Sequence, residues 1–118
     1  MKKGIIVDDA TVMRMRLRDI LEKKYEIVGE AEDGKKALAL YLAMKPDFIT
    51  LDISMPNVDG LEALNLILSA DPTARVVIVS AVGQKQIVFE ALSRGAKDFI
   101  VKPFDPERVI ISIDRLFS

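Results

Sequence analysis

Residues 4–9 read Gly4-Ile5-Ile6-Val7-Asp8-Asp9, a short apolar run that ends in two acids. Three further runs have the same form, and each ends at a single polar residue: 48–51 before Asp52, 76–79 before Ser80 and 99–101 before Lys102. Continuous apolar runs rich in β-branched residues are typical of strands buried on both faces of a parallel sheet. Because parallel strands end at the same edge of a sheet, we expect these acids, the hydroxyl and the ammonium group to meet there.

Helical patterns separate the apolar runs along the chain, and this alternation predicts βαβ units around one parallel sheet. We expect strands at 4–7, 25–31, 48–51, 76–79 and 99–101. We expect helices from Thr11 as N-cap to Lys23-Lys24, at about 34–44 and 61–70, before Gly95, and from Asp105 with Pro106 at the first position. The fold class is therefore α/β, with helices on both faces of the sheet. Residues 1–118 are expected to form one domain without an output domain.

The composition restricts the chemistry of any site. The 118 residues include no cysteine and no histidine, which excludes thiolate and imidazole groups as ligands or bases. A bound metal would therefore be hard and oxygen-ligated, such as Mg²⁺ or Mn²⁺. The net charge of −1 predicts no nucleic-acid partner. With no apolar stretch of about 20 residues and no signal-peptide pattern, we expect a cytoplasmic protein without a membrane partner.

Five motifs at the predicted strand ends and loops resemble the receiver domains of response regulators, especially the single-domain receivers of chemotaxis. They are Ile6-Val7-Asp8-Asp9, Leu51-Asp52-Ile53-Ser54-Met55-Pro56, Asp59-Gly60, Val79-Ser80-Ala81 and Val101-Lys102-Pro103-Phe104. The resemblance covers essentially the whole chain, with the motifs in the family's order and spacing. It implies a doubly wound, flavodoxin-like (βα)5 fold with strand order 2-1-3-4-5.

The three acids predict a magnesium site, because clustered carboxylates repel one another without a cation. Taken singly, an acid or serine after a strand can cap the next helix, and Lys102 can be a surface lysine. By resemblance, Asp9 and Asp52 are direct Mg²⁺ ligands, Asp8 acts through water, and Ser54 contributes its backbone carbonyl. The resemblance also makes Asp52 the phosphoacceptor, assisted by the Lys102 ammonium and the Ser80 hydroxyl. A cis peptide at Lys102-Pro103 is part of the same pattern.

Signal transmission is expected to involve Ser80 and Phe99, which receivers move on phosphorylation. Phe99 replaces the tyrosine of many chemotaxis members, so a latch through a phenolic hydroxyl is absent, and an ordinary core phenylalanine is the alternative. By resemblance, Ser54 and Val82 modulate the dephosphorylation rate. The helix at 87–92 carries a wide apolar arc, and Ile111 should point outward from the last helix. We therefore expect a partner surface that is formed by Val88, Leu92, Phe99 and Ile111.

The main functional hypothesis is a phosphorylation-activated switch rather than an enzyme beyond its own phosphorylation and slow dephosphorylation. A sensor histidine kinase would donate the phosphoryl group, and the partner would be a flagellar switch protein, another output protein or a second copy. An alternative is a phosphorelay intermediate that passes phosphate to a histidine phosphotransfer protein. A phosphatase of the haloacid-dehalogenase type is disfavoured because Ser54 stands where its second acid belongs. An FMN carrier is disfavoured because Asp8-Asp9 would repel phosphate.

Overall fold

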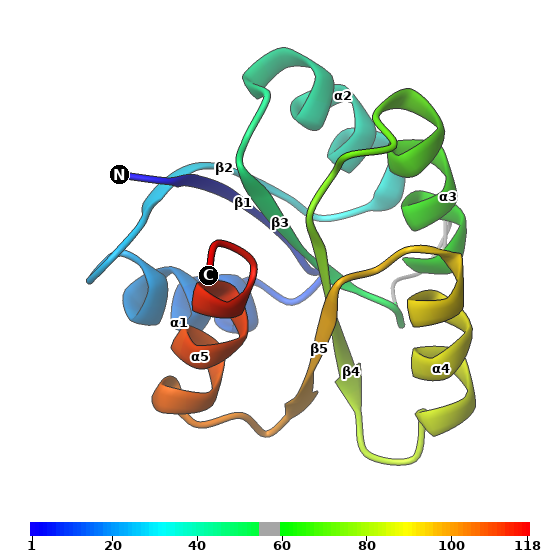
Figure 1. Cartoon of the computed structure of the whole chain (residues 1–118). Helices are drawn as coiled ribbons and strands as arrows, with labels where there is room; N and C mark the ends of the chain where they lie inside the picture. The colour runs from blue at the N-terminus through cyan, green and yellow to red at the C-terminus, as the bar shows by residue number, and fades with distance from the viewer. Residues whose placement is uncertain (55–59) are drawn as a thin grey trace.

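The chain folds as a parallel sheet between two layers of helices (Figure 1). The computed structural model describes residues 1–54 and 60–118; Met55, Pro56, Asn57 and Asp59 of the predicted loop motifs lie outside them. The described elements are, in order, β1 (Lys3–Val7), α1 (Thr11–Leu21), β2 (Glu26–Ala31), α2 (Gly34–Met44), β3 (Phe48–Asp52), α3 (Gly60–Ala70), β4 (Val76–Ala81), α4 (Lys85–Arg94), β5 (Asp98–Lys102) and α5 (Pro106–Arg115). The strands are parallel in the order β2-β1-β3-β4-β5, which confirms the predicted fold.

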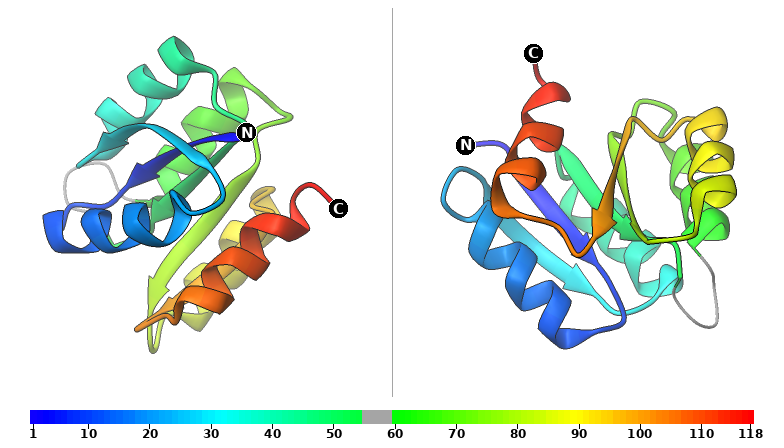
Figure 2. Two further views of the ribbon diagram at one scale, coloured as in Figure 1. Left: turned by 90° about the vertical axis from the view of Figure 1, so that its left-hand side faces the viewer. Right: turned by 90° about the horizontal axis from the view of Figure 1, so that it is seen from below.

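The two faces of the sheet are covered by different helices, α1 and α5 on one side and α2, α3 and α4 on the other (Figure 2). Successive strand residues alternate between these layers, so Ile5 packs with α2 and α3, whereas Ile6 packs with α1 and α5. Both residues are fully buried, as are all five residues of β3. The runs in β1, β3 and β4 are therefore strands buried on both faces, as predicted. The prediction was wrong for the run at 99–101, because β5 is an edge strand in which Phe99 is half-buried and Val101 is exposed.

The helix ends agree with the sequence except at α1. The side chains of Asp33 and Asp105 accept hydrogen bonds from the N–H groups of Lys36 and Arg108, so both acids are N-caps. The prediction of Thr11 as an N-cap was wrong, because Thr11 is already helical and Ala10 occupies the cap position without a side-chain bond. The Thr11 hydroxyl instead accepts a bond from the Arg14 guanidinium.

Gly60 opens α3 against the end of β3. An added Cβ would lie 2.2 Å from the Cα of Ile53 and 2.7 Å from the carbonyl oxygen of Asp52. No side chain fits at that distance, so a glycine allows α3 to begin directly beside Asp52. This steric restriction explains why glycine occupies the second position of the predicted Asp59-Gly60 motif.

Polar side chains are paired at the opposite, amino edge of the sheet. The Tyr25 hydroxyl donates to Asp114, whose carboxylate also lies 2.7 Å from the Lys24 ammonium. Similarly, the Tyr41 hydroxyl donates to Asp71 at 2.8 Å. These bonds join the start of β2 to the end of α5, and the last turn of α2 to the residue that follows α3.

No helix among the described residues is long and apolar enough to cross a bilayer.

Candidate functional site

Three carboxylates converge at the carboxyl edge of the sheet. Asp8 and Asp9 follow β1 directly, and Asp52 is the last residue of the neighbouring β3. Each offers a carboxylate oxygen, and these oxygens all lie within 4.8 Å of one another. The side chains of Asp8 and Asp52 are buried, whereas Asp9 is exposed. A hard divalent cation fits this donor set, because it consists of oxygen atoms alone and carries excess negative charge.

Lys102 reaches two of the acids from the end of β5. Its ammonium nitrogen lies 3.0 Å from Asp8 Oδ2 and 3.4 Å from Asp52 Oδ2. Burial disfavours the charged ammonium, but the bond to Asp8 and the attraction of both carboxylates outweigh it and raise the pKa of Lys102. The Lys102–Pro103 peptide is cis, as the resemblance implied. Lys102 is therefore a component of the site and not a surface residue.

Asp8 carries its charge in an unfavourable position. Burial raises the pKa of its carboxyl; the Ala10 N–H and Lys102 oppose this shift, and the charge of Asp52 adds to it. The Ala10 N–H donates to Asp8 Oδ1 at 2.9 Å. The single ammonium group of Lys102 cannot neutralise the two buried carboxylates of Asp8 and Asp52 completely. The remaining negative charge is a further reason for a cation to bind here.

The carboxylate of Asp52 is held from both sides. Its Oδ1 accepts bonds from the Ser54 N–H at 3.0 Å and from the Ser54 hydroxyl at 2.8 Å, whereas its Oδ2 faces Lys102. Metal binding through the Ser54 carbonyl and rate modulation by Ser54, the two roles expected from the sequence, stay predictions. The direct contact between the serine hydroxyl and Asp52 was not expected.

Ser80 places a buried hydroxyl on β4, the strand between β3 and β5. Its side chain is fully buried, and its Oγ has no hydrogen-bond partner among residues 1–54 and 60–118. A buried hydroxyl without a partner is uncommon and needs an explanation. A donor for an incoming oxyanion would be one, which agrees with the predicted role of Ser80.

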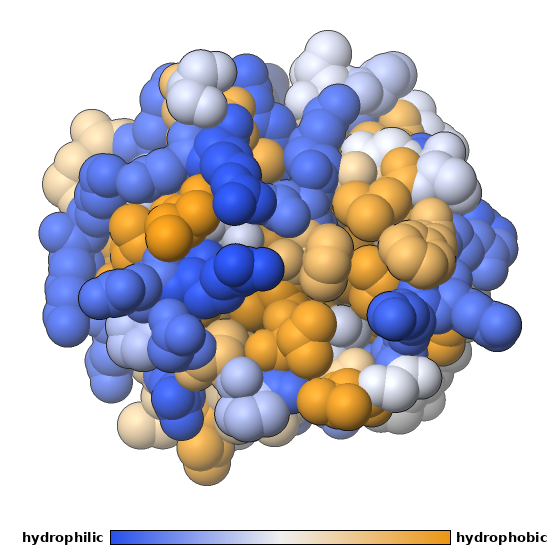
Figure 3. All heavy atoms as spheres, turned by 60° about the horizontal axis from the view of Figure 1, so that its bottom comes forward, coloured by the Kyte–Doolittle hydropathy of each residue, from blue (hydrophilic) through white to orange (hydrophobic). Residues whose placement is uncertain are grey.

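An apolar hollow of about 440 Å³ is lined by residues of the loop after β4, of α4 and of β5. Ser80, the half-buried Phe99 and the exposed Val82 line it. Apolar side chains gather over β5 between α4 and α5 (Figure 3), the face on which the partner surface was expected.

Three residues of the expected partner surface were misplaced. Val88 is 4% exposed and packs in the core, and Leu92 is half-buried against the same cluster. The helix presents Phe89 to solvent instead, with 61% of its surface exposed. Ile111 is 45% exposed on α5, which confirms its outward direction. The exposed apolar residues around the hollow are therefore Val82, Phe89 and Val101. Ile111 lies elsewhere, in a hollow that it lines with Ile20 of α1 and with Lys23 just after that helix, so its place in the expected surface was wrong.

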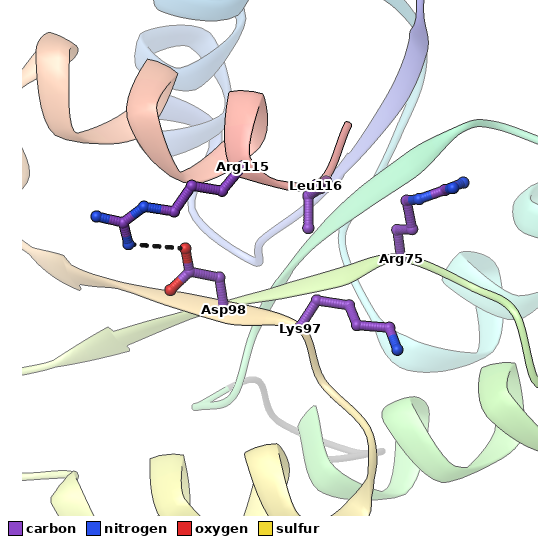
Figure 4. A pocket seen from close by; sticks show the side chains of 5 residues that line it. All are labelled: Arg75, Lys97, Asp98, Arg115 and Leu116. Atoms are coloured by element: carbon purple, nitrogen blue, oxygen red, sulfur yellow. Dashed lines mark hydrogen bonds and ion pairs between the residues drawn. The ribbon is translucent and has the colours of Figure 1, made fainter. Parts of the chain in front are cut away.

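A second hollow, of about 350 Å³, lies at the amino edge and has a different character. Arg75, Lys97 and Arg115 line it together with Asp98 and Leu116. Figure 4 shows that Arg115 reaches toward Asp98, at 3.5 Å, whereas Arg75 and Lys97 extend in the opposite direction. Its cations do not converge on one point, so the carboxyl edge remains the candidate site.

Comparison with known proteins identifies the arrangement. Residues 5–114 match the response regulator receiver domain family. This chain belongs to that family. Receiver domains are phosphorylation-activated switches of two-component systems and bind Mg²⁺, so this receiver is a signalling switch and not a conventional enzyme. A histidine kinase as phosphodonor and an output protein are the partners that the family implies.

The most similar relatives include single-domain receivers. The receiver is 47% identical to chemotaxis protein CheY of Thermotoga maritima, over 98% of this chain and 97% of the relative. It is 48% identical to chemotaxis protein CheY of Listeria monocytogenes, over 98% of both chains. Among solved structures, the CheX–CheY–BeF3–Mg²⁺ complex from Borrelia burgdorferi superimposes with a TM-score of 0.94 and 37% identity, covering 99% of this chain and 90% of that chain.

Two polar contacts near the site have no counterpart in the sequence motifs. The Arg14 guanidinium donates to the backbone carbonyl of Asp8 at 2.6 Å. Gln84 accepts a bond from the Ala81 N–H at 2.6 Å and so holds the loop after β4. Neither residue comes directly after the last residue of a strand, and their spacing from the acids gives no periodic signal. Sequence patterns could not have found them.

Proposed function

We propose that the chain carries chemotaxis signals by accepting a phosphoryl group on Asp52. The observation that supports this most directly is the environment of the Asp52 carboxylate. One oxygen is held by Ser54, the other faces Lys102, and two further acids offer oxygens within 4.8 Å. Each of these groups has a defined use in phosphoryl transfer.

The proposed reaction is an in-line displacement at phosphorus. A carboxylate oxygen of Asp52 forms a bond to phosphorus as the P–N bond to the histidine of a kinase breaks. The bonding electron pair returns to the imidazole, which leaves as a neutral ring because its other nitrogen carries a proton. The product is an aspartyl phosphate, and water later hydrolyses it.

The residues around Asp52 stabilise the negative charge that spreads over the phosphoryl oxygens. Lys102 supplies a compact positive charge, and the Ser80 hydroxyl is a donor without another partner among the described residues. Asp8, Asp9 and Asp52 would hold the Mg²⁺, with Asp8 acting through water and the Ser54 carbonyl as a further ligand. The bound ion supplies additional neutralisation of the phosphoryl oxygens.

The similarity to chemotaxis proteins supports the choice of pathway. We propose a CheA-like kinase as donor, and a flagellar switch protein or another output protein as the receiver of the signal. The partner would bind the face of α4, β5 and α5, where Phe89 and Val101 are exposed, and Ser80 and Phe99 would transmit the change. Because the Borrelia relative was solved with CheX, BeF3 and Mg²⁺, a beryllofluoride-loaded form is the natural bait for partners.

The proposal is tested by phosphorylation with acetyl phosphate and Mg²⁺. Intact-mass spectrometry should show a gain of one phosphoryl group on the wild-type chain and none on Asp52→Asn. Asp19→Asn, which removes an exposed acid from α1, is the control and should be phosphorylated like the wild type. Equal phosphorylation of Asp52→Asn would show that another residue is the acceptor.

A further inference from the structure

The side chain of Arg14, on the first turn of α1, is built into the loop that carries the acids. Its Nη1 donates to the Asp8 carbonyl at 2.6 Å, its Nε to Glu30 Oε1 at 3.1 Å, and its Nη2 to Thr11 Oγ1 at 3.2 Å. Only 14% of the side chain is exposed. The planar guanidinium presents its donors in a fixed fork, so these three bonds together define its position.

The carbonyl that Arg14 binds belongs to the peptide between the two acids. The other polar groups of Asp8 are also held, because its N–H donates to the Ala31 carbonyl at 3.1 Å and its Oδ1 accepts from Ala10. The bond from Arg14 fixes the remaining freedom, the orientation of the Asp8–Asp9 peptide plane. That plane sets the direction in which Asp9 leaves the backbone.

Asp9 depends on this backbone support more than the other acids do. It is exposed, and within residues 1–54 and 60–118 its carboxylate makes no hydrogen bond or ion pair. Asp8 and Asp52, by contrast, are buried and bound to Lys102. The approach of Asp9 to within 4.8 Å of the other two carboxylates therefore rests on the conformation of its own peptide.

We infer that Arg14 is a positioning residue for the magnesium site, acting through the Asp8 carbonyl on the direction of Asp9. The inference rests on the proposed role of Asp9 as a ligand. Glu30, at the end of β2, and Thr11 hold the guanidinium in place, so α1 and β2 together set the geometry of the acidic loop. Groups that orient metal ligands change metal affinity without touching the metal.

The sign of the effect separates positioning from simple electrostatics. Arg14 is a cation beside a cation site, so its charge alone weakens Mg²⁺ binding, and its removal would strengthen binding. If Arg14 positions Asp9, its removal weakens binding instead. A fall in affinity on loss of a positive charge has no electrostatic explanation.

Arg18 provides a matched control one turn further along α1. Its Nε binds the other oxygen of Glu30 at 2.6 Å, and its Nη1 binds Glu22 at 3.1 Å. It therefore carries the same charge and shares a partner with Arg14, but it makes no bond to the loop of residues 8–10. Arg18→Gln removes the charge and leaves the bond to the Asp8 carbonyl.

The test is isothermal titration of Mg²⁺ into the full chain at neutral pH and constant ionic strength. Arg14→Gln should raise the Kd for Mg²⁺ by about tenfold, at the lower end of the range for such supporting groups. Arg14→Lys keeps the charge but cannot make all three bonds, so its Kd should also rise. Arg18→Gln should bind within about twofold of the wild type. Thermal unfolding without Mg²⁺ checks that each variant is folded.

The outcomes are distinguishable. Wild-type or tighter Mg²⁺ binding by Arg14→Gln would overturn the positioning role. If that variant fails to fold, wild-type affinity in Arg14→Lys would overturn it equally. An equal loss in Arg18→Gln would assign the effect to Glu30 or to the helix rather than to the carbonyl bond. Absence of Mg²⁺ binding by the wild-type chain would instead contradict the proposed metal site.

Discussion

The two edges of the sheet differ in whether their polar side chains have hydrogen-bond and ion-pair partners. At the carboxyl edge, Asp8, Asp52 and Ser80 are buried, the carboxylates are crowded, and the serine hydroxyl has no partner among the described residues. At the amino edge, Asp71 and Asp114 are partly exposed and accept bonds from tyrosine hydroxyls. The carboxyl edge therefore has buried polar groups whose charge or hydrogen-bonding capacity a ligand could match. The polar groups of the amino edge already form hydrogen bonds and ion pairs with one another.

The pKa shifts reflect the same difference. Burial raises the pKa of Asp8, so its ionised form is less favourable in the folded chain than in the unfolded one. The pKa of Asp114 is lowered, first by Lys24 and then by Tyr25, so folding favours its ionised form. We conclude that the amino edge stabilises the fold, whereas the carboxyl edge costs stability that a ligand can restore.

The largest expected effect on stability is at the amino edge. Asp114→Ala should destabilise the chain by about 2 kcal/mol, because the nearly buried Tyr25 hydroxyl loses its acceptor and Lys24 its partner. Urea denaturation followed by circular dichroism measures this change. Asp19→Ala, at an exposed acid of α1, should stay within about 0.5 kcal/mol of the wild type. If Asp114→Ala were as stable as the wild type, the amino edge would not stabilise the fold and the difference between the two edges would not hold.

A smaller effect of opposite sign is expected at the carboxyl edge. Asp9→Asn should stabilise the metal-free chain by about 1 kcal/mol, since it removes one of three close carboxylates and keeps both ion pairs of Lys102. Thermal unfolding with a chelator and with Mg²⁺ measures both states. The wild type should gain about 1.4 kcal/mol at Mg²⁺ ten times its Kd, and the variant should gain little. If metal-free Asp9→Asn were less stable than the wild type, the conclusion that the crowded carboxylates cost stability would be contradicted.

The smallest effect concerns pH and Asp71. Its pKa is lowered by the Thr73 hydroxyl, the Tyr41 hydroxyl and the Thr73 N–H, so its contribution to stability is present above the unfolded value of 3.8. This contribution is lost as the pH falls through the lowered pKa. Asp71→Asn should therefore cost about 0.5 kcal/mol at neutral pH, and the difference from the wild type should disappear in acid. Urea denaturation from pH 7 to well below 3.8 tests this, and a difference that grows in acid would show the sign to be wrong.

The strands and the acidic cluster could be predicted because both depend on local sequence and on one rule of topology. Apolar runs identify buried strands, and parallel strands bring the residues that follow them to one edge. The N-cap of α1 could not be predicted in this way, because the Thr11 hydroxyl is occupied by Arg14, a contact that depends on side-chain conformation.

The face of α4 shows a second limit. Apolar residues cover an arc of α4 that is wider than one buried stripe, so the sequence does not say which part of the arc faces the sheet. Packing turns Val88 and Ala91 inward and leaves Phe89 exposed, which reverses part of the predicted partner surface. Where the apolar arc is wider than the contact, only the neighbouring elements select the buried side.

By itself, the sequence determined the α/β class, the positions of the strands and the acids, hydroxyl and lysine that follow them. The tertiary structure decided how those groups are held: Ser54 on one oxygen of Asp52, Lys102 between two acids, and Arg14 on the peptide that carries Asp9. The physical reason is that hydrophobic periodicity depends only on the types of neighbouring residues. These polar contacts depend on side-chain and loop angles that only the packed fold defines, even between residues as close in sequence as Ser54 and Asp52.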